Sequence, residues 1–134
     1  MRYLFDTDVI SALLRKGPLT RLRQRIARVP AREQCTTAIT LAELSYGAYK
    51  VGKLDLYARV RTILNELEIL SFDLAAAEQY GPLRARLERS GRKLDEADLR
   101  IASIALVHDC TLITGNVRHF ARIEDLRVEN WLED

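Results

Sequence analysis

Short apolar segments alternate with longer helical segments along the whole of this 134-residue chain. Strands that alternate with helices need crossover connections, which place the strands parallel in one sheet with helices on both faces. We therefore expect a single α/β domain over residues 1–134, with a central, mostly parallel sheet flanked by helices. The strands are predicted at 3–5, 34–38, 68–72, 110–114 and 127–131.

Start and stop signals place helices between these strands. A helical pattern begins at Asp6-Thr7-Asp8, with Asp8 as the expected N-cap, and Gly17-Pro18 is expected to end that helix. No linker, repeat or low-complexity segment divides the chain. The later helices are predicted at 19–28, 41–50, 54–67, 74–90 and 94–107.

Composition excludes several classes of protein. Apolar residues make up 48% of the chain, but no apolar run is long enough to cross a bilayer, and the N-terminus lacks the apolar core of a signal peptide. We therefore expect a cytoplasmic protein without a membrane segment. Cys35 and Cys110 are far apart and form no Cys-x-x-Cys motif, which favours reduced, buried thiols.

Basic residues form two groups, although the net charge is only +2. Such groups attract phosphate backbones, but they are also typical of solvated helix faces, and both interpretations stay open here. The first group comprises Arg15, Lys16, Arg21, Arg23, Arg25, Arg28 and Arg32, and the second Arg84, Arg86, Arg89, Arg92 and Lys93.

Asp6 directly follows an apolar strand, so its carboxylate is expected at the edge of the core, where an unpaired charge is costly. A cation, hydrogen-bond donors or protonation would relieve that cost. Open α/β sheets bind ligands just beyond the carboxyl ends of their strands, and Thr114-Gly115-Asn116 follows a later strand. A functional role is therefore the favoured explanation for Asp6.

Other polar residues have structural explanations that compete with a functional one. Glu43 ends Thr40-Leu41-Ala42-Glu43, which matches a helix capping box. Asp98 shares the first turn of a helix with Asp95 and Glu96, where the helix dipole favours acids. Three acids in four positions exceed what capping needs, however, and their repulsion favours a bound cation. Asn116 suits a turn, or its amide could face a metal-bound water or a phosphate.

The candidate acids lie at a strand end or a helix start, and such positions converge at one edge of a parallel sheet. Clustered carboxylate oxygens suit Mg²⁺ or Mn²⁺, and two such ions can drive the cleavage of a phosphodiester bond. Nucleophilic catalysis is a weak alternative, because the only histidines, His108 and His119, belong to no recognisable triad or metalloprotease motif.

Four motifs, in the same order and spacing, resemble those of the PIN-domain ribonucleases, and specifically the VapC toxins of bacterial toxin–antitoxin pairs. The resemblance covers nearly the whole chain. Each motif is weak alone, but the four together are specific. They lie at 3–10, 37–47, 98–106 and 112–120, followed by a similar tail at 128–131.

This resemblance implies a PIN-like three-layer α/β/α fold and a metal-dependent endoribonuclease. It implies that Asp6, Glu43 and Asp98 are the catalytic carboxylates and that, with Asn116, they hold Mg²⁺ or Mn²⁺. RNA would be the substrate. It further implies a homodimer and a cognate VapB-type antitoxin whose C-terminal segment occupies the active-site groove.

The chain departs from the family pattern at two places. Asp8 stands where asparagine is common, and its added charge would draw a second metal or merely cap the helix. Leu94-Asp95-Glu96-Ala97 replaces a common Gly-Pro pair. Asp95 is therefore either an N-cap, which we favour, or an auxiliary metal ligand.

Two other interpretations compete with the nuclease. Asp6-Thr7-Asp8-Val9 also fits the nucleophile motif of haloacid dehalogenase-type phosphatases, but Val117-Arg118 stands where that class needs a pair of acids after a strand. An inactive PIN-like module that only binds RNA or protein is the second alternative. Such a binder has no need of clustered carboxylates facing phosphates, which argues against it.

Overall fold

The computed structural model describes residues 1–15 and 20–132, so the predicted stop signal at Gly17-Pro18 lies outside the described residues. Its strands are β1 (Arg2–Phe5), β2 (Gln34–Thr37), β3 (Glu68–Leu70), β4 (Cys110–Ile113) and β5 (Val128–Glu129). Its helices are α1 (Thr7–Leu14), α2 (Thr20–Ala27), α3 (Ala38–Lys50), α4 (Leu54–Asn65), α5 (Leu74–Arg89), α6 (Glu96–Val107) and α7 (Val117–Phe120), with a 3₁₀ turn at Ala31–Glu33.

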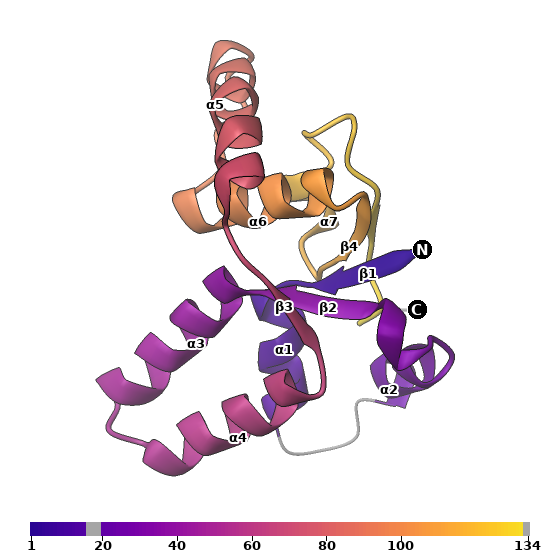
Figure 1. The fold of residues 1–134 in the computed structure, drawn as a ribbon, viewed down its shortest axis with the longest axis vertical. Helices are drawn as coiled ribbons and strands as arrows, with labels where there is room; N and C mark the ends of the chain where they lie inside the picture. Colours follow the sequence, from indigo (N-terminus) through magenta and orange to yellow (C-terminus); the bar gives the residue numbers. More distant parts are fainter. Residues whose placement is uncertain (16–19, 133–134) are drawn as a thin grey trace.

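The five strands form one parallel sheet in the order β3-β2-β1-β4-β5. β1 is central, and its Leu4 pairs with Cys35 of β2 on one side and with Leu112 of β4 on the other. Helices α5, α6 and α7 lie on one side of the sheet, and α1, α2, α3 and α4 lie on the other (Figure 1). The predicted three-layer α/β/α fold is confirmed.

The hydrophobic core is divided by the sheet, because successive residues of a strand point to opposite faces. Leu4 packs with the buried side chains of α5 and α6, whereas Phe5 packs with those of α1 and α4. The ring of Trp131 lies 5.7 Å from the Phe5 ring, between centroids, and ties the C-terminal segment to this second cluster. Each such buried side chain stabilises the fold by about 1.5–3 kcal/mol.

The two cysteines are buried and unoxidised, as predicted. Cys35 of β2 and Cys110 of β4 flank β1, and their sulfurs are 3.9 Å apart without a disulfide. Among the described residues, no helix is both long and apolar enough to cross a membrane.

Several element boundaries differ from the prediction, and helix caps explain two of them. α3 begins three residues early, at Ala38, because the Thr37 hydroxyl at the end of β2 accepts a hydrogen bond from the Thr40 N–H at 3.1 Å. α6 begins at Glu96 because Asp95 caps it. β5 is only two residues long, shorter than the strand expected at 127–131.

The strand order creates the crevice in which such folds place their sites. The chain proceeds outward from β1 to β2 and β3, then returns to β4 on the other side of β1. The order therefore reverses between β1 and β4, and the residues just beyond these two strands border the crevice. Asp6 follows β1, and Thr114 follows β4.

Candidate active site

A polar pocket of about 260 Å³ lies beyond the carboxyl ends of β1 and β4. It brings together all four predicted site residues, which come from four different places in the sequence. The carboxylates stand at the starts of α1 and α6 and inside α3, and the amide precedes α7. The pocket is lined by Asp6, Thr7, Asp8, Glu43, Asp95, Asp98, Asn116 and Phe120.

Asp6 is nearly enclosed at the start of α1, with 4% of its surface exposed. Its Oδ1 accepts a hydrogen bond from the Val9 N–H at 3.0 Å, so Asp6 is the N-cap of α1. The prediction that Asp8 caps this helix was wrong, because β1 ends one residue before Asp6 and the helix starts at Thr7. Burial raises the pKa of Asp6 to about 6, although the hydroxyl of Thr114 donates a hydrogen bond to it.

Glu43 lies in the second turn of α3, and the capping-box explanation for it was wrong. Thr37, not Thr40, caps this helix, so Glu43 is too far along α3 to return to the cap. Its Oε1 instead accepts a hydrogen bond from the hydroxyl of Thr7, at 2.6 Å, across the gap between α3 and α1. Glu43 therefore faces the pocket for a reason other than helix capping.

Asp98 lies in the first turn of α6, as predicted, with a quarter of its side chain exposed. Its Oδ2 is 3.2 Å from Nε2 of His119 in α7. Asp95 is the N-cap of α6 and accepts the Asp98 N–H at 2.8 Å, which confirms the favoured explanation for it. Burial raises the pKa of Asp98 to about 7, and the negative charges of Asp95 and Asp6 add to that effect.

Asn116 directly precedes α7, but its side chain makes no capping hydrogen bond to that helix. Its backbone N–H donates to the Thr114 hydroxyl at 3.0 Å, and the same hydroxyl hydrogen-bonds Asp6. The turn after β4 is thereby fixed to the start of α1, while the exposed Asn116 amide lines the pocket.

The oxygen donors of this pocket fit a hard divalent cation. Five carboxylates share one small space, and their repulsion is one cause of the raised pKa of Asp98. A cation would relieve that repulsion. In the described ranges no three His, Cys, Asp or Glu side chains already converge on a common point, because Glu43 turns towards Thr7 and Asp98 towards His119. Oε2 of Glu43 and Oδ1 of Asp98 take no part in these two contacts.

Comparison with known proteins identifies the family. The PIN domain family model matches residues 3–126. Ribonuclease VapC2 of Haemophilus influenzae is 32% identical, with 98% of this chain and 99% of that protein aligned. The chain belongs to the VapC ribonucleases of the PIN domain family. A second VapC relative, named a tRNA(fMet)-specific endonuclease, from Shigella flexneri, is 30% identical, and the alignment covers 98% of each chain.

Solved structures agree with this assignment. The VapBC2 complex of Rickettsia felis bound to a promoter DNA fragment contains a chain that superimposes with a TM-score of 0.89 at 33% identity, covering 98% of this chain and 99% of that one. The DNA-bound VapBC complex of Salmonella typhimurium gives a TM-score of 0.90 at 32% identity, covering 98% of both chains. Membership of the VapC family decides against the phosphatase interpretation of Asp6-Thr7-Asp8-Val9.

Three polar residues of the VapC site were missed from the sequence: Thr7, Thr114 and His119. All three contact a predicted acid rather than standing in for one. The available signal was position, because Thr7 adjoins Asp6 and Thr114 ends the strand predicted at 110–114, just before Asn116. A hydroxyl next to a clustered carboxylate is a common means of orienting it.

The two basic groups differ in their environment. In the second group, Arg84 and Arg86 of α5 form ion pairs: Arg84 with Glu88 and Glu96, and Arg86 with Asp125. α2 lies near the amino ends of the strands, at the end of the sheet away from the start of α3 (Figure 1). Arg21, Arg23 and Arg25 of the first group, which belong to α2, are therefore not part of the carboxylate pocket. Any effect of these residues on RNA would act over a distance.

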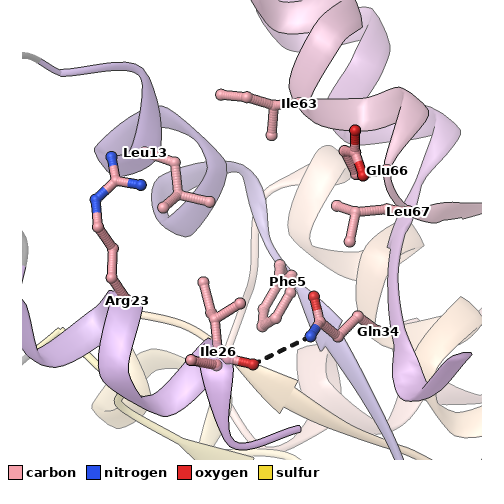
Figure 2. Close-up of a pocket in the computed structure, with 9 residues that line it drawn as sticks. Phe5, Leu13, Arg23, Ile26, Gln34, Ile63, Glu66 and Leu67 are labelled. Atoms are coloured by element: carbon pink, nitrogen blue, oxygen red, sulfur yellow. Dashed lines mark hydrogen bonds between the residues drawn. The ribbon is translucent and has the colours of Figure 1, made fainter. Parts of the chain in front are cut away.

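A second, apolar pocket of about 320 Å³ lies between α1, α2 and α4. Figure 2 shows the side chains of Leu13, Ile26 and Ile63 turned towards the space above the Phe5 ring. Gln34 closes one side, where its amide donates to the carbonyl of Ile26 at 3.2 Å. Polar groups stand only at the edge of this pocket, so it offers a surface for an apolar side chain rather than for catalysis.

Proposed function

We propose that this chain is the toxin of a toxin–antitoxin pair and an endoribonuclease that hydrolyses RNA phosphodiester bonds with Mg²⁺, which Mn²⁺ can replace. The observation that carries the proposal is the meeting of Asp6, Glu43 and Asp98 in one pocket at the strand-order reversal. The names of the relatives, ribonuclease VapC and tRNA(fMet)-specific endonuclease VapC, support RNA as the substrate.

The charge of the pocket explains why a cation is needed. A pocket of five carboxylates repels the phosphate of an RNA backbone, so the bare protein is unsuited to its own substrate. A bound divalent ion would activate water and stabilise the negative charge that develops on the phosphate. The pKa values of about 6 for Asp6 and about 7 for Asp98 mean that protons compete with a cation for these oxygens.

Each residue has a distinct part in this proposal. Asp6 and Asp98, which line the same pocket, would hold the principal ion. Glu43 would support a second ion or orient the attacking water, and the Asn116 amide would hold a metal-bound water or a phosphate oxygen. Asp6 and Asp95 are in addition the N-caps of α1 and α6, so the helix ends themselves fix the spacing of the acids.

We also propose that a VapB-type antitoxin inhibits the enzyme, since solved relatives are VapBC complexes. Its C-terminal segment would occupy the carboxylate pocket, and an apolar side chain of the same partner would enter the space between Leu13, Ile26 and Ile63. A cytoplasmic location is part of this proposal, because the substrate RNA and the antitoxin are both expected there. So is a homodimer, which the resemblance to the VapC toxins implies.

RNA cleavage under controlled metal tests the proposal. The purified chain is incubated with RNA after treatment with a chelator, and Mg²⁺ or Mn²⁺ is then added back. We expect no cleavage with the chelator, full cleavage after Mg²⁺ or Mn²⁺, and inhibition by the product of the adjacent gene. Cleavage that persists in the chelator would refute the metal-dependent mechanism. RNA binding without cleavage under all conditions would instead support the inactive binding module.

A further inference from the structure

Three threonine hydroxyls form a continuous chain of hydrogen bonds that ends on Glu43. The Thr37 Oγ1 is 3.3 Å from the Thr40 Oγ1, which is 3.1 Å from the Thr7 Oγ1. The Thr7 hydroxyl in turn donates to Oε1 of Glu43 at 2.6 Å. Thr37 and Thr40 are fully buried, Thr7 is half-buried and Glu43 is exposed, so the chain runs from the protein interior to the pocket.

The direction of every bond in this chain is determined. A hydroxyl group has one proton, and an ionised carboxylate can only accept. Thr7 gives its proton to Glu43, so it must accept from Thr40. Thr40 then has no proton left for Thr37, which must donate to it. All three hydroxyl bonds therefore point towards Glu43, and bonds aligned in this way strengthen one another.

The inner end of the chain is a backbone group. The Thr37 hydroxyl accepts the N–H of Thr40 at 3.1 Å, which is one of the free N–H groups at the start of α3. An amide N–H does not exchange protons with a hydroxyl during catalysis. The chain therefore cannot carry a proton to or from Glu43, and its effect is to hold the carboxylate in place.

We propose that Thr7 is a positioning residue, which fixes Oε1 of Glu43 through this hydroxyl chain and so leaves Oε2 directed at the metal-binding pocket. This inference rests on the proposed function, because it concerns the same site. A glutamate on an exposed part of a helix otherwise samples several rotamers, and ordering it on binding costs conformational entropy. Thr7 orders the side chain beforehand.

The chain of hydroxyl groups also sets the distance between the carboxylates of Asp6 and Glu43, which lie on different elements. Thr7 is the first residue of α1 and follows Asp6 directly, whereas Thr40 and Glu43 belong to α3. The bond between the Thr7 and Thr40 hydroxyls therefore ties the start of α1 to α3. A change at Thr7 should move Glu43 relative to Asp6 without removing either acid.

The test compares Thr7→Val, which removes the hydroxyl at nearly constant volume, with Thr7→Ser, which keeps it. Thr62→Val is the matched control, because the Thr62 hydroxyl bonds the Ala58 carbonyl on α4, away from the pocket. Mn²⁺ affinity is measured by calorimetry without RNA, RNA cleavage gives kcat and KM, and crystal structures give the position of the Glu43 carboxylate.

We expect Thr7→Val to weaken Mn²⁺ binding by about tenfold and to lower kcat by a similar factor, with KM for RNA little changed. In its crystal structure the Glu43 carboxylate should leave the position that it has in the wild type. Thr7→Ser should restore the affinity, the rate and the position, and Thr62→Val should match the wild type throughout. The stoichiometry of Mn²⁺ binding separates this effect from a general loss of folding, because unfolded protein lowers the number of sites and the apparent kcat but not the affinity of the folded molecules.

Two results would overturn the inference. Thr7→Val could bind Mn²⁺ and place Glu43 as the wild type does, or Thr7→Ser could be as impaired as Thr7→Val, which would show that the hydroxyl alone does not position Glu43. If the wild type neither bound Mn²⁺ nor cleaved RNA, the proposed function would fail. The crystal structures would still decide whether Thr7 positions Glu43, and Thr7→Ala would replace Thr7→Val if the latter did not fold.

Discussion

Phe5 and Asp6 are neighbours in the sequence, yet they border pockets of opposite chemistry. Phe5 lines the apolar pocket between α1, α2 and α4, and Asp6 lines the carboxylate pocket beyond the sheet. In the first pocket, apolar side chains are in contact with water. In the second, neighbouring carboxylates repel one another, which opposes folding. Each surface is unfavourable in the isolated chain and suits a different ligand, an apolar side chain in one and a cation in the other.

Removing charge from the carboxylate pocket should have the largest effect on activity. Asp6→Asn and Asp98→Asn each keep the shape of the side chain, and asparagine can still cap α1. We expect RNA cleavage to fall on the order of 1,000-fold in both, because a ligand for the cation is lost. Single-turnover cleavage rates measure this. Asp55→Asn, in the first turn of α4, is the matched control and should cleave normally.

Placing charge in the apolar pocket should weaken antitoxin binding and leave the carboxylate pocket unaffected. Ile63→Glu puts a carboxylate among Leu13, Ile26 and Phe5, and we expect antitoxin binding to weaken by about 30-fold, or about 2 kcal/mol. RNA cleavage by the free toxin should not change. Thr62→Glu, which adds the same charge at the adjacent exposed position of α4, is the control for surface plasmon resonance. Equal binding by both variants would exclude this pocket from the interface.

The carboxylate pocket should make the metal-free protein less stable as pH rises. The folded-state pKa values of about 6 for Asp6 and about 7 for Asp98 lie above the ordinary value of 3.8. The folded chain therefore holds more protons than the unfolded chain between these values, so stability is highest below pH about 4 for these groups and falls as pH rises through about 7.

Denaturant unfolding at several pH values measures this loss, which we expect to be about 1–3 kcal/mol between pH about 5 and about 8. Asp98→Asn should flatten the profile, and Mn²⁺ should offset the loss in the wild type. A metal-free profile that rises with pH over this range would mean that burial and charge repulsion do not raise the pKa values of Asp6 and Asp98.

The smallest expected effect separates the two roles of Asp95. As the N-cap of α6 it accepts the Asp98 N–H, so Asp95→Ala should lower the free energy of unfolding by about 1 kcal/mol. Asp95→Asn should restore stability and leave Mn²⁺ affinity close to that of the wild type. Thermal unfolding and calorimetry measure the two quantities. If Asp95→Asn folded normally but lost Mn²⁺ affinity, Asp95 would be an auxiliary ligand.

The sheet and its site could be predicted because they depend on local patterns. β1 and β4 are short apolar segments followed by polar residues, and parallel strands bring such ends together. The positions of Asp6 and Asn116 follow from this rule alone. Glu43 and Asp98 needed the family motifs, because their helix positions also suit capping.

Details that depend on exact helix starts could not be predicted. A shift of α3 by three residues replaced Thr40 with Thr37 as the cap and freed Glu43 for its bond with Thr7. A shift of α1 made Asp6 rather than Asp8 the cap. The contact of His119 with Asp98 joins residues of α7 and α6, and it depends on how these two helices pack, which their local sequence patterns do not specify.

The central claim is that the carboxylates form a site for a divalent ion, and calorimetric titration of Mn²⁺ into the RNA-free protein tests it most directly. The wild type and Asp55→Asn should bind Mn²⁺ with the same affinity, and Asp6→Asn and Asp98→Asn should show little or no binding heat. Equal Mn²⁺ binding by all four proteins, or none by the wild type at concentrations that support RNA cleavage, would contradict the claim.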